Sequence, residues 1–328
     1  MLELRVLSGE EVRQALPMAE AIEAMKTAYA QLSTGRATVP LRTPIEVPAH
    51  HGLVLFMPAY LAGDDQMAIK IVSVFSDNPA RGLPLIHALV VVVDPTTGRP
   101  AAVMDGTVLT ALRTGAASGA ATDLLARPDS HVAAVFGAGV QGRTQLEAVC
   151  AVRPIEQAWI YDPKPPAARA YAEEMGARLG IPVRPAATPA EAVREADVIC
   201  TATTSATPVF DDADLKPGVH INAIGAYTPQ MQEIPAETVV RARVVVDHRP
   251  AALAEAGDLI IPLQRGLITE DHLEAEIGEI VAGLKPGRTT PEEITLFKSV
   301  GVAVQDVAAA AQVLAAAERR GLGSVVAL

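Results

Sequence analysis

Cysteine is nearly absent from this sequence, which has only Cys150 and Cys200 among 328 residues. Both stand among apolar neighbours, and neither belongs to a CxxC motif or a cysteine–histidine cluster. The sequence therefore predicts no disulfide framework and no metal site. We expect the chain to be cytoplasmic, with reduced thiols.

Positive charge and long hydrophobic runs are also scarce. Lysine and arginine number 27 against 38 acidic residues, which gives a net charge of -11, and aromatic residues make up 3% of the chain. Because there is no basic run or arginine–aromatic stripe, we expect neither nucleic acid nor a membrane as a partner. The longest apolar run, residues 83–93, is broken by Pro84 and His87 and is too short to span a bilayer. The absence of basic patches therefore favours a small-molecule partner. Hydrolase patterns such as GxSxG are also missing, so the sequence does not support a hydrolase.

The strongest motif that is present is HVAAVFGAGVQG, at residues 131–142. An apolar strand that ends in Gly137, Gly139 and Gly142 can place a pyrophosphate on the N-terminus of the next helix. The first glycine allows a tight turn, the second lets the phosphates approach, and the third lets the helix pack closely on the strand. Asp162 follows about twenty residues later, where an acid would accept hydrogen bonds from ribose hydroxyls. We therefore predict a dinucleotide cofactor.

The elements around this motif follow two patterns. Residues 8–35 begin with a Ser8–Glu11 capping box and continue as an amphipathic helix that Pro17 can kink. Residues 38–93 are typical of the short strands of a sheet, and a helix rich in small residues follows at 105–127, where another backbone or a ligand can pass closely. After the glycine motif, helices and strands alternate, which predicts a parallel sheet covered on both faces. A last alanine-rich helix is expected at 299–319.

The carboxyl ends of the later strands are expected to form the ligand side of that sheet, because ligands bind there in parallel α/β sheets. This rule places residues 201–203, residues 225–227 and Asp247 on the cofactor side. Asp258 follows a glycine near the substrate side, and capping of a helix is an equally good interpretation of it.

Three cations stand in apolar segments before the glycine motif, namely Arg42, Lys70 and Arg113. An unpaired charge in such a segment is costly, because it loses its hydration. Lys70, in the strand-like MAIKIVSVF, is the most indicative, although an ordinary salt bridge or a solvent-facing edge position explains it equally well by itself. Together, two guanidinium groups and an ammonium group suit a clamp for a carboxylate.

The sequence resembles the ornithine cyclodeaminase/mu-crystallin family over nearly its whole length. The segments that carry the resemblance are VPLRTPIE, AIKIVSVF, GLPLIHALVVVVDPTTGRPAAVMDG, LTALRTGAASGAAT, VFGAGVQGRTQLEAV, INAIGAYTPQMQEI and TLFKSVG. The resemblance implies an α/β fold of two domains and a homodimer. Residues 1–115 would form an α+β domain for substrate binding and dimerisation, completed by a C-terminal helix at 305–328. Residues 116–304 would form a Rossmann domain, a doubly wound parallel sheet.

The resemblance also implies site residues by position. Arg42, Lys70 and Arg113 correspond to the family's substrate-carboxylate residues, and Arg113 also adjoins the cofactor. The other implied dinucleotide residues are Thr114, Gly137, Gly139, Val140, Gln141, Gly142, Asp162, Thr201, Thr203 and Ser299. Both NAD(H) and NADP(H) fit this pattern. Asp162 slightly favours NAD(H), whereas Lys164 could turn toward the 2′-phosphate of NADP(H).

Tyr227 is the main departure from the family's pattern. Its cyclodeaminases, and a related alanine dehydrogenase, have an aspartate two residues after the glycine of an NA[VI]G segment, where this sequence has Tyr227. That aspartate is the group that manages protons at the amine. Tyr227 takes its place among the candidate catalytic residues, but a phenol is a poor base at neutral pH. Mu-crystallin-like ketimine reductases also lack the aspartate, and they share the Lys298–Ser299 pair.

The GAYTP segment is most similar to that of bacterial reductases of cyclic imino acids. The expected reaction is NAD(P)H-dependent reduction of Δ1-pyrroline-2-carboxylate to L-proline, with Δ1-piperideine-2-carboxylate to L-pipecolate as the other ring size. Positioning of the substrate would supply most of the catalysis. Two alternatives stay open. One is an ornithine cyclodeaminase or alanine dehydrogenase-like oxidoreductase that uses Tyr227 or Asp258 as its acid, and the other is a non-catalytic, mu-crystallin-like binding protein, against which the three cations argue.

Overall fold

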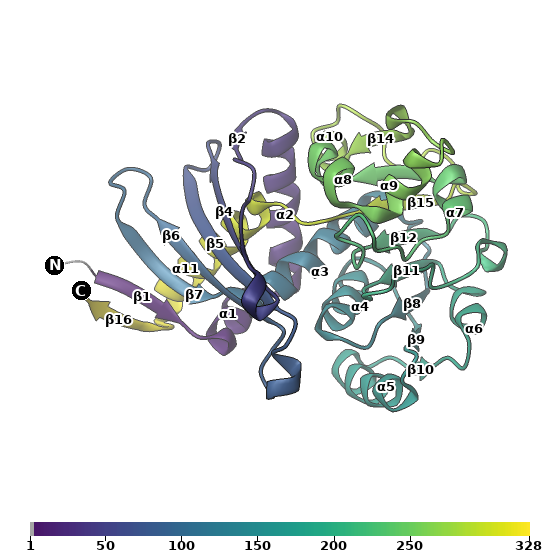
Figure 1. Cartoon of the computed structure of the whole chain (residues 1–328), viewed down its shortest axis with the longest axis horizontal. Coiled ribbons are helices and arrows are strands. Elements are labelled where there is room, and N and C mark those ends of the chain that lie inside the picture. Colours follow the sequence, from purple (N-terminus) through teal and green to yellow (C-terminus); the bar gives the residue numbers. More distant parts are fainter. Residues whose placement is uncertain (1–2) are drawn as a thin grey trace. The chain divides into compact units, whose positions relative to one another are not determined.

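The computed structural model describes residues 3–328, which divide into two compact units. Unit 1 comprises the chain up to residue 113 together with residues 302–328, and unit 2 comprises residues 114–301. Each unit is built around its own sheet (Figure 1). The domain boundaries expected from the sequence lie at residues 115 and 305. They remain a prediction.

The sheet of unit 1 has the strand order β16-β1-β7-β6-β5-β4-β2, with β3 paired to β4. Its strands are β1 (Glu3–Leu7), β2 (Ala37–Thr38), β3 (Thr43–Val47), β4 (Gly52–Leu61), β5 (Gln66–Phe75), β6 (Ile86–Val93), β7 (Pro100–Asp105) and β16 (Ser324–Ala327). All neighbours are antiparallel except β1 and β7, which are parallel. The segments expected as strands between residues 38 and 93 thus form β2 to β6.

Helices cover one face of this sheet. Pro17 separates α1 (Gly9–Ala15) from α2 (Met18–Ser33), and α2 and α11 (Ala303–Arg320) pack together, with α11 also against β4 and β5. Alternation along β5 puts Lys70 on the buried, helix-covered face, in register with Met57 of β4 and Val90 of β6. The neighbouring positions, such as Ile71, lie on the opposite face, which is only half-buried.

The last helix begins later than expected. Residues 295–298 form a strand, and α11 starts at residue 303, not 299. It ends at Gly321, which has the left-handed conformation. The reason is Asp247, whose carboxylate accepts hydrogen bonds from the Ser299 side chain and from the next two backbone N–H groups. These bonds hold residues 299–301 outside a helix.

The sheet of unit 2 is parallel throughout, in the order β10-β9-β8-β11-β12-β15-β13-β14. Its strands are β8 (Val132–Phe136), β9 (Gln157–Tyr161), β10 (Val183–Pro185), β11 (Val198–Thr201), β12 (His220–Ala223), β13 (Arg243–Val246), β14 (Leu273–Glu276) and β15 (Thr295–Lys298). The order runs outward in both directions from β8 and β11, so this is the predicted doubly wound sheet, and its switch point lies where β8 ends.

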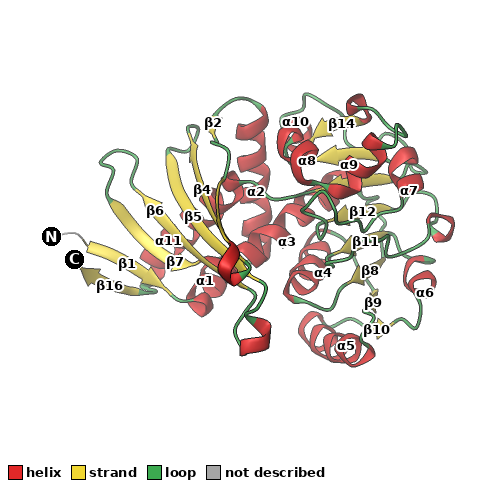
Figure 2. Cartoon of the chain, viewed as in Figure 1, coloured by secondary structure: helices red, strands yellow, loops and turns green. Residues whose placement is uncertain are grey.

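Helices flank this sheet on both sides, with α4 and α5 on one side and α6 and α7 on the other (Figure 2). The helices are α3 (Gly106–Leu125, which begins in unit 1), α4 (Val140–Val152), α5 (Pro165–Leu179), α6 (Pro189–Val193), α7 (Ala236–Arg241), α8 (Arg249–Glu255), α9 (Gly257–Gln264) and α10 (Ile277–Val281). Short 3₁₀ helices are η1 (Pro48–His50), η2 (Pro79–Arg81), η3 (Asp212–Asp214) and η4 (Glu270–His272).

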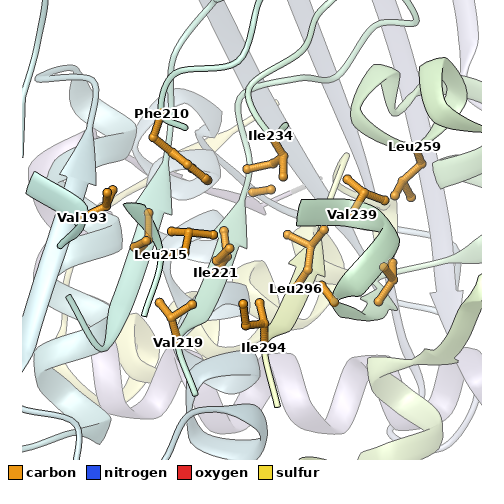
Figure 3. Close-up of a cluster of buried hydrophobic side chains, with 14 of the residues drawn as sticks. Val193, Phe210, Leu215, Val219, Ile221, Ile234, Val239, Leu259, Ile294 and Leu296 are labelled. Carbon is orange, nitrogen blue, oxygen red and sulfur yellow. The ribbon is translucent and has the colours of Figure 1, made fainter. Parts of the chain in front are cut away.

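Apolar side chains on the strands of unit 2 form its hydrophobic core on both faces of the sheet. Ile221 and Leu296 lie side by side in β12 and β15 and pack against residues of the covering segments, such as Ile234 and Val239 (Figure 3). Between α3 and α4 the backbones are close, because a Cβ on Gly115 would lie 2.5 Å from the carbonyl oxygen of Thr144. The small residues of α3 thus allow the close approach of another backbone, as the composition of this helix indicated. Within residues 3–328, no helix combines the length and apolar character that crossing a bilayer needs.

Candidate functional site

The glycine motif forms the turn between β8 and α4. Gly137 has a φ of 99°, and a Cβ there would lie 2.6 Å from the carbonyl oxygen of Ala202. A Cβ on Gly142 would collide with the carbonyl oxygen of Gly137, whereas nothing lies within 4 Å of a Cβ on Gly139. The first and third glycines therefore serve the turn and the helix packing. The second leaves the backbone at the helix N-terminus open to a phosphate.

Asp162 lies just past β9, beside this turn. One carboxylate oxygen accepts a hydrogen bond from Ala138 N at 3.0 Å, and the other accepts one from Lys164 N at 2.9 Å. Each oxygen keeps a further lone pair that can accept from a ribose hydroxyl. Val140, the first residue of α4, is 60% exposed, and Gln141 follows it. The arrangement fits the adenosine and pyrophosphate parts of a dinucleotide.

Thr201 and Thr203 both bind Glu233, a residue that the sequence did not single out. Thr201 Oγ1 donates to one Glu233 oxygen at 2.9 Å, and Thr203 N donates to the other at 2.6 Å. The first oxygen also accepts from Gly225 N at 2.6 Å. Glu233 is fully buried, and burial together with the nearby Asp258 carboxylate raises its pKa. One carboxylate thus joins the loops that follow β11 and β12.

Asp258 does not cap a helix, which was one of the two interpretations of this residue. Its Oδ1 accepts from Glu233 N at 2.7 Å and from Ile234 N at 3.0 Å, and its Oδ2 accepts from Lys298 Nζ at 2.9 Å. The N-cap of α9 is Ala256, which makes no side-chain cap. Asp258 and Lys298 are both 0% exposed. Asp258 is therefore committed to a buried ion pair and two backbone contacts, which leaves it poorly placed to exchange protons with a substrate.

Ser299 lies at the end of β15, where its Oγ donates to Asp247 at 2.8 Å. Burial raises the pKa of Asp247, and the hydrogen bonds that it accepts oppose that rise. Thr114, at the start of unit 2, is buried, and its carbonyl oxygen accepts from Gln145 Nε2 at 3.3 Å. Contacts of Ser299 and Thr114 with a nicotinamide cofactor stay predictions.

In unit 1, two of the three predicted cations converge on the first turn of α11. Lys70 Nζ lies 2.8 Å from Asp306 Oδ2, and Arg113 Nε donates to Asp306 Oδ1 at 3.0 Å. Arg113 Nη1 also donates to Gln305 Oε1 at 2.9 Å. Lys70 is 2% exposed and Asp306 1%. The solvent-facing interpretation of Lys70 is therefore wrong, and the salt-bridge interpretation is confirmed. This salt bridge belongs to a buried charge cluster.

Arg42, a half-buried residue in the exposed segment before β3, acts on the same cluster. Burial lowers the pKa of Lys70 to about 8, the Asp306 charge opposes this shift, and the charges of Arg113 and Arg42 add to it. Arg42 thus lies within electrostatic range of Lys70. Three cations less one anion leave a charge of plus two when all four groups are ionised, which suits an incoming carboxylate.

Tyr227 lies in the loop that follows β12, and its side chain is 42% exposed. The backbone of this loop is held at Gly225 by Glu233. A catalytic role for Tyr227 stays a prediction. Among residues 3–328, no three histidine, cysteine, aspartate or glutamate side chains gather in a way that could hold a metal ion.

Asp306 and Glu233 are the two site residues that sequence reasoning missed. For Asp306 a signal exists, because in a helix it shares a face with Val302, Ala310 and Val313, so an acid stands in an apolar stripe. Glu233 gives no such signal, since it lies in an irregular segment and its partners come from other strand ends.

Comparison with known proteins identifies the family. A sequence model described as the ornithine cyclodeaminase/mu-crystallin family matches residues 3–321. The chain belongs to this family. It is 39% identical to a Δ1-pyrroline-2-carboxylate reductase of Bacillus cereus over 97% of this chain and 98% of the relative.

Solved structures of family members share the whole fold. A Δ1-pyrroline-2-carboxylate reductase of Thermococcus litoralis, in complex with NADH and L-proline, has a TM-score of 0.95 at 45% identity, covering 98% of this chain and all of that one. An archaeal alanine dehydrogenase dimer with bound NAD has a TM-score of 0.93 at 38% identity, covering all of both chains. The family resemblance and the fold class predicted from the sequence are confirmed.

Proposed function

We propose that this chain is an NAD(P)H-dependent reductase that converts the cyclic imino acid Δ1-pyrroline-2-carboxylate to L-proline, with the six-membered homologue as a further substrate. The observation that carries the proposal is the buried cation cluster of Lys70 and Arg113, which suits a small carboxylate, in a chain that also has a dinucleotide turn. The names of the Bacillus and Thermococcus relatives support it.

The cofactor would be held by unit 2. Gly139, Val140 and Gln141 would bind the pyrophosphate at the α4 N-terminus, and Asp162 would bind the adenosine ribose. The reduced dinucleotide supplies the hydride when it is bound. NADH or NAD in the structures of two relatives supports NAD(H), and NADP(H) is the alternative.

The substrate carboxylate would be held by unit 1. Two N–H groups of Arg113 donate hydrogen bonds to side chains of α11. A guanidinium has five N–H groups, so Arg113 can also bind a substrate carboxylate. Lys70 adds a point charge, and Arg42 adds a second guanidinium. An imine protonated at nitrogen is already electrophilic, so the main task of these residues is to fix its orientation.

Tyr227 favours this reaction over amino-acid deamination or dehydrogenation, although one structural relative is an alanine dehydrogenase. A deaminating enzyme must move protons repeatedly at the α-nitrogen, and an exposed phenol is a weak base for that task. Reduction of a preformed imine avoids most of those steps. Asp258 is not a substitute, because it is committed to Lys298 and two backbone groups.

We further propose a cytoplasmic homodimer. The dimer of the archaeal relative supports the oligomeric state, as does the face of the unit 1 sheet opposite the helices. On that face Phe56, Ile71 and Leu89 lie in one cross-strand row, and Leu89 is 41% exposed. The two free thiols, Cys150 and Cys200, agree with a reducing compartment.

The test is cofactor consumption by the purified protein with a panel of substrates. We expect rapid NADH oxidation with five- and six-membered cyclic imino acids, little release of ammonia from ornithine or lysine with NAD, and slow NAD reduction with alanine. Lys70→Met should suppress imine reduction while dinucleotide binding stays largely intact, and Lys285→Met, at an exposed position after α10, should change neither. Parent-like reduction by Lys70→Met would show that the clamp is wrong.

A further inference from the structure

The first turn of α11 places a fixed anion beside the cations that would bind the substrate. Asp306 pairs with Lys70 through one oxygen and with Arg113 through the other, at 2.8 and 3.0 Å. The substrate carboxylate is itself an anion, so a buried carboxylate at this place weakens the attraction that the cations exert on it. An imine that is already protonated at nitrogen does not need Asp306 as an acid. The presence of Asp306 therefore requires a separate explanation.

We propose that Asp306 is a positioning residue that keeps Lys70 protonated, and so able to bind the substrate carboxylate, at neutral pH. This inference rests on the proposed function, because it assumes that Lys70 binds the substrate.

The surroundings of Lys70 oppose its charge. Its neighbours across the sheet, Met57 and Val90, are apolar and buried, so the ammonium loses its hydration. Arg113 from α3 and Arg42 from the segment before β3 repel it, and Asp306 from α11 attracts it. With all of these effects, the pKa of Lys70 is about 8. Removal of Asp306 would therefore lower the pKa further, and Lys70 would lose its charge in the neutral range.

Gln305 gives an independent reason to assign this turn to a ligand site. Its Oε1 accepts from Arg113 Nη1 and from Val302 N, which orients the amide. Its Nε2 has no hydrogen-bond partner within residues 3–328, although the side chain is 0% exposed. A buried donor without an acceptor is costly. The oxygens of a bound carboxylate would satisfy this donor, so the turn suits a ligand and is more than a structural ion pair.

The test measures the affinity of pyrrole-2-carboxylate, in the presence of NADH, between pH 6 and 9. This probe has the planar five-membered ring and the carboxylate, but its ring nitrogen does not titrate in that range. Affinity for the parent should fall as the pH rises through the Lys70 pKa of about 8. In Asp306→Asn this fall should begin at least about one pH unit lower, because a close counter-charge shifts a pKa by about 1–3 units. For a shift of one pH unit, the variant should bind about threefold more weakly than the parent at pH 7.5. At pH 6, where Lys70 is charged in both proteins, the variant should bind at least as tightly as the parent, because the Asp306 charge no longer repels the probe.

Two variants control this test. Lys70→Arg keeps its charge at every pH used, so its affinity should not fall, and Asp306→Asn added to it should not move the profile. Asp123→Asn removes an Arg153–Asp123 ion pair in unit 2 and should leave the parent profile unchanged. If Asp306→Asn weakens binding equally at all pH values, its role is structural and the proposal is wrong. If Asp306→Asn does not fold, Lys70→Arg alone decides. A fall in its affinity for pyrrole-2-carboxylate near pH 8 would overturn the proposal, and an affinity that stays constant with pH would support it.

Failure of this inference differs from failure of the proposed function. If Lys70→Met binds pyrrole-2-carboxylate as tightly as the parent, the carboxylate clamp itself is wrong. If Lys70→Met loses binding while Asp306→Asn keeps the parent's pH profile, the clamp stands and only the role of Asp306 is wrong.

Discussion

At the scale of single residues, we expect the choice between imine reduction and deamination to depend on Tyr227. We expect Tyr227→Phe to keep much of the reductase activity, within about threefold of the parent, because its phenol can only donate a weak hydrogen bond or pack on a ring. Steady-state rates with Δ1-pyrroline-2-carboxylate and NADH measure this. A loss of a hundredfold or more in kcat would instead make the hydroxyl the proton donor of the reaction.

Asp162 is the residue that sets the cofactor preference in this account. We expect NADH to be used at least as well as NADPH, since a carboxylate accepts from a ribose hydroxyl but repels a 2′-phosphate. Asp162→Ser should raise the ratio of NADPH to NADH specificity constants by about tenfold, and it should also raise the KM for NADH, because the bond to Ala138 N is lost. A tenfold or greater NADPH preference in the parent would contradict this role and would point to Lys164.

At the scale of elements, Glu233 connects the ends of β11 and β12, so the loops there are expected to move together. Glu233→Gln puts an amide N–H₂ opposite a backbone donor, either that of Thr203 or that of Gly225, and should destabilise the protein by about 1–3 kcal/mol. The KM for NADH should rise severalfold, more than the KM for the imino acid. Thermal unfolding and steady-state kinetics test this, with the exposed Glu237→Gln as control. A lower melting temperature with an unchanged KM for NADH would reduce Glu233 to a structural role.

The elements also show which features the sequence can predict. The glycine turn is predictable because the glycines that it needs are close together in the sequence. A functional role for Lys70 is predictable because a charge in an apolar strand is costly by itself. The Lys70–Asp306 and Arg113–Asp306 pairs join distant parts of the chain. Periodicity does not specify such contacts. The start of α11 is not predictable from periodicity either, because it depends on hydrogen bonds from residues 299–301 to Asp247, which is distant in the sequence.

At the scale of the whole molecule, the half-buried face of the unit 1 sheet is expected to hold two copies together. The parent should sediment as a dimer, twice the chain mass of 34.2 kDa. Leu89→Glu, in the cross-strand row with Ile71, should shift it toward the monomer, because a buried unpaired charge at an interface is costly. Sedimentation velocity measures this, and Val240→Glu, equally exposed on α7 at 43%, is the control. If Leu89→Glu stays dimeric, this face is not the interface.

The central claim is that the whole chain reduces a preformed cyclic imine and does not deaminate an amino acid. The most direct measurement uses NADH that carries deuterium at both C4 positions and follows the label into the product by mass spectrometry. With Δ1-pyrroline-2-carboxylate, the account predicts L-proline that carries one deuterium at its α-carbon, and no appreciable ammonia from ornithine with NAD. Unlabelled or absent proline in the first reaction, or rapid release of proline and ammonia in the second, would contradict it.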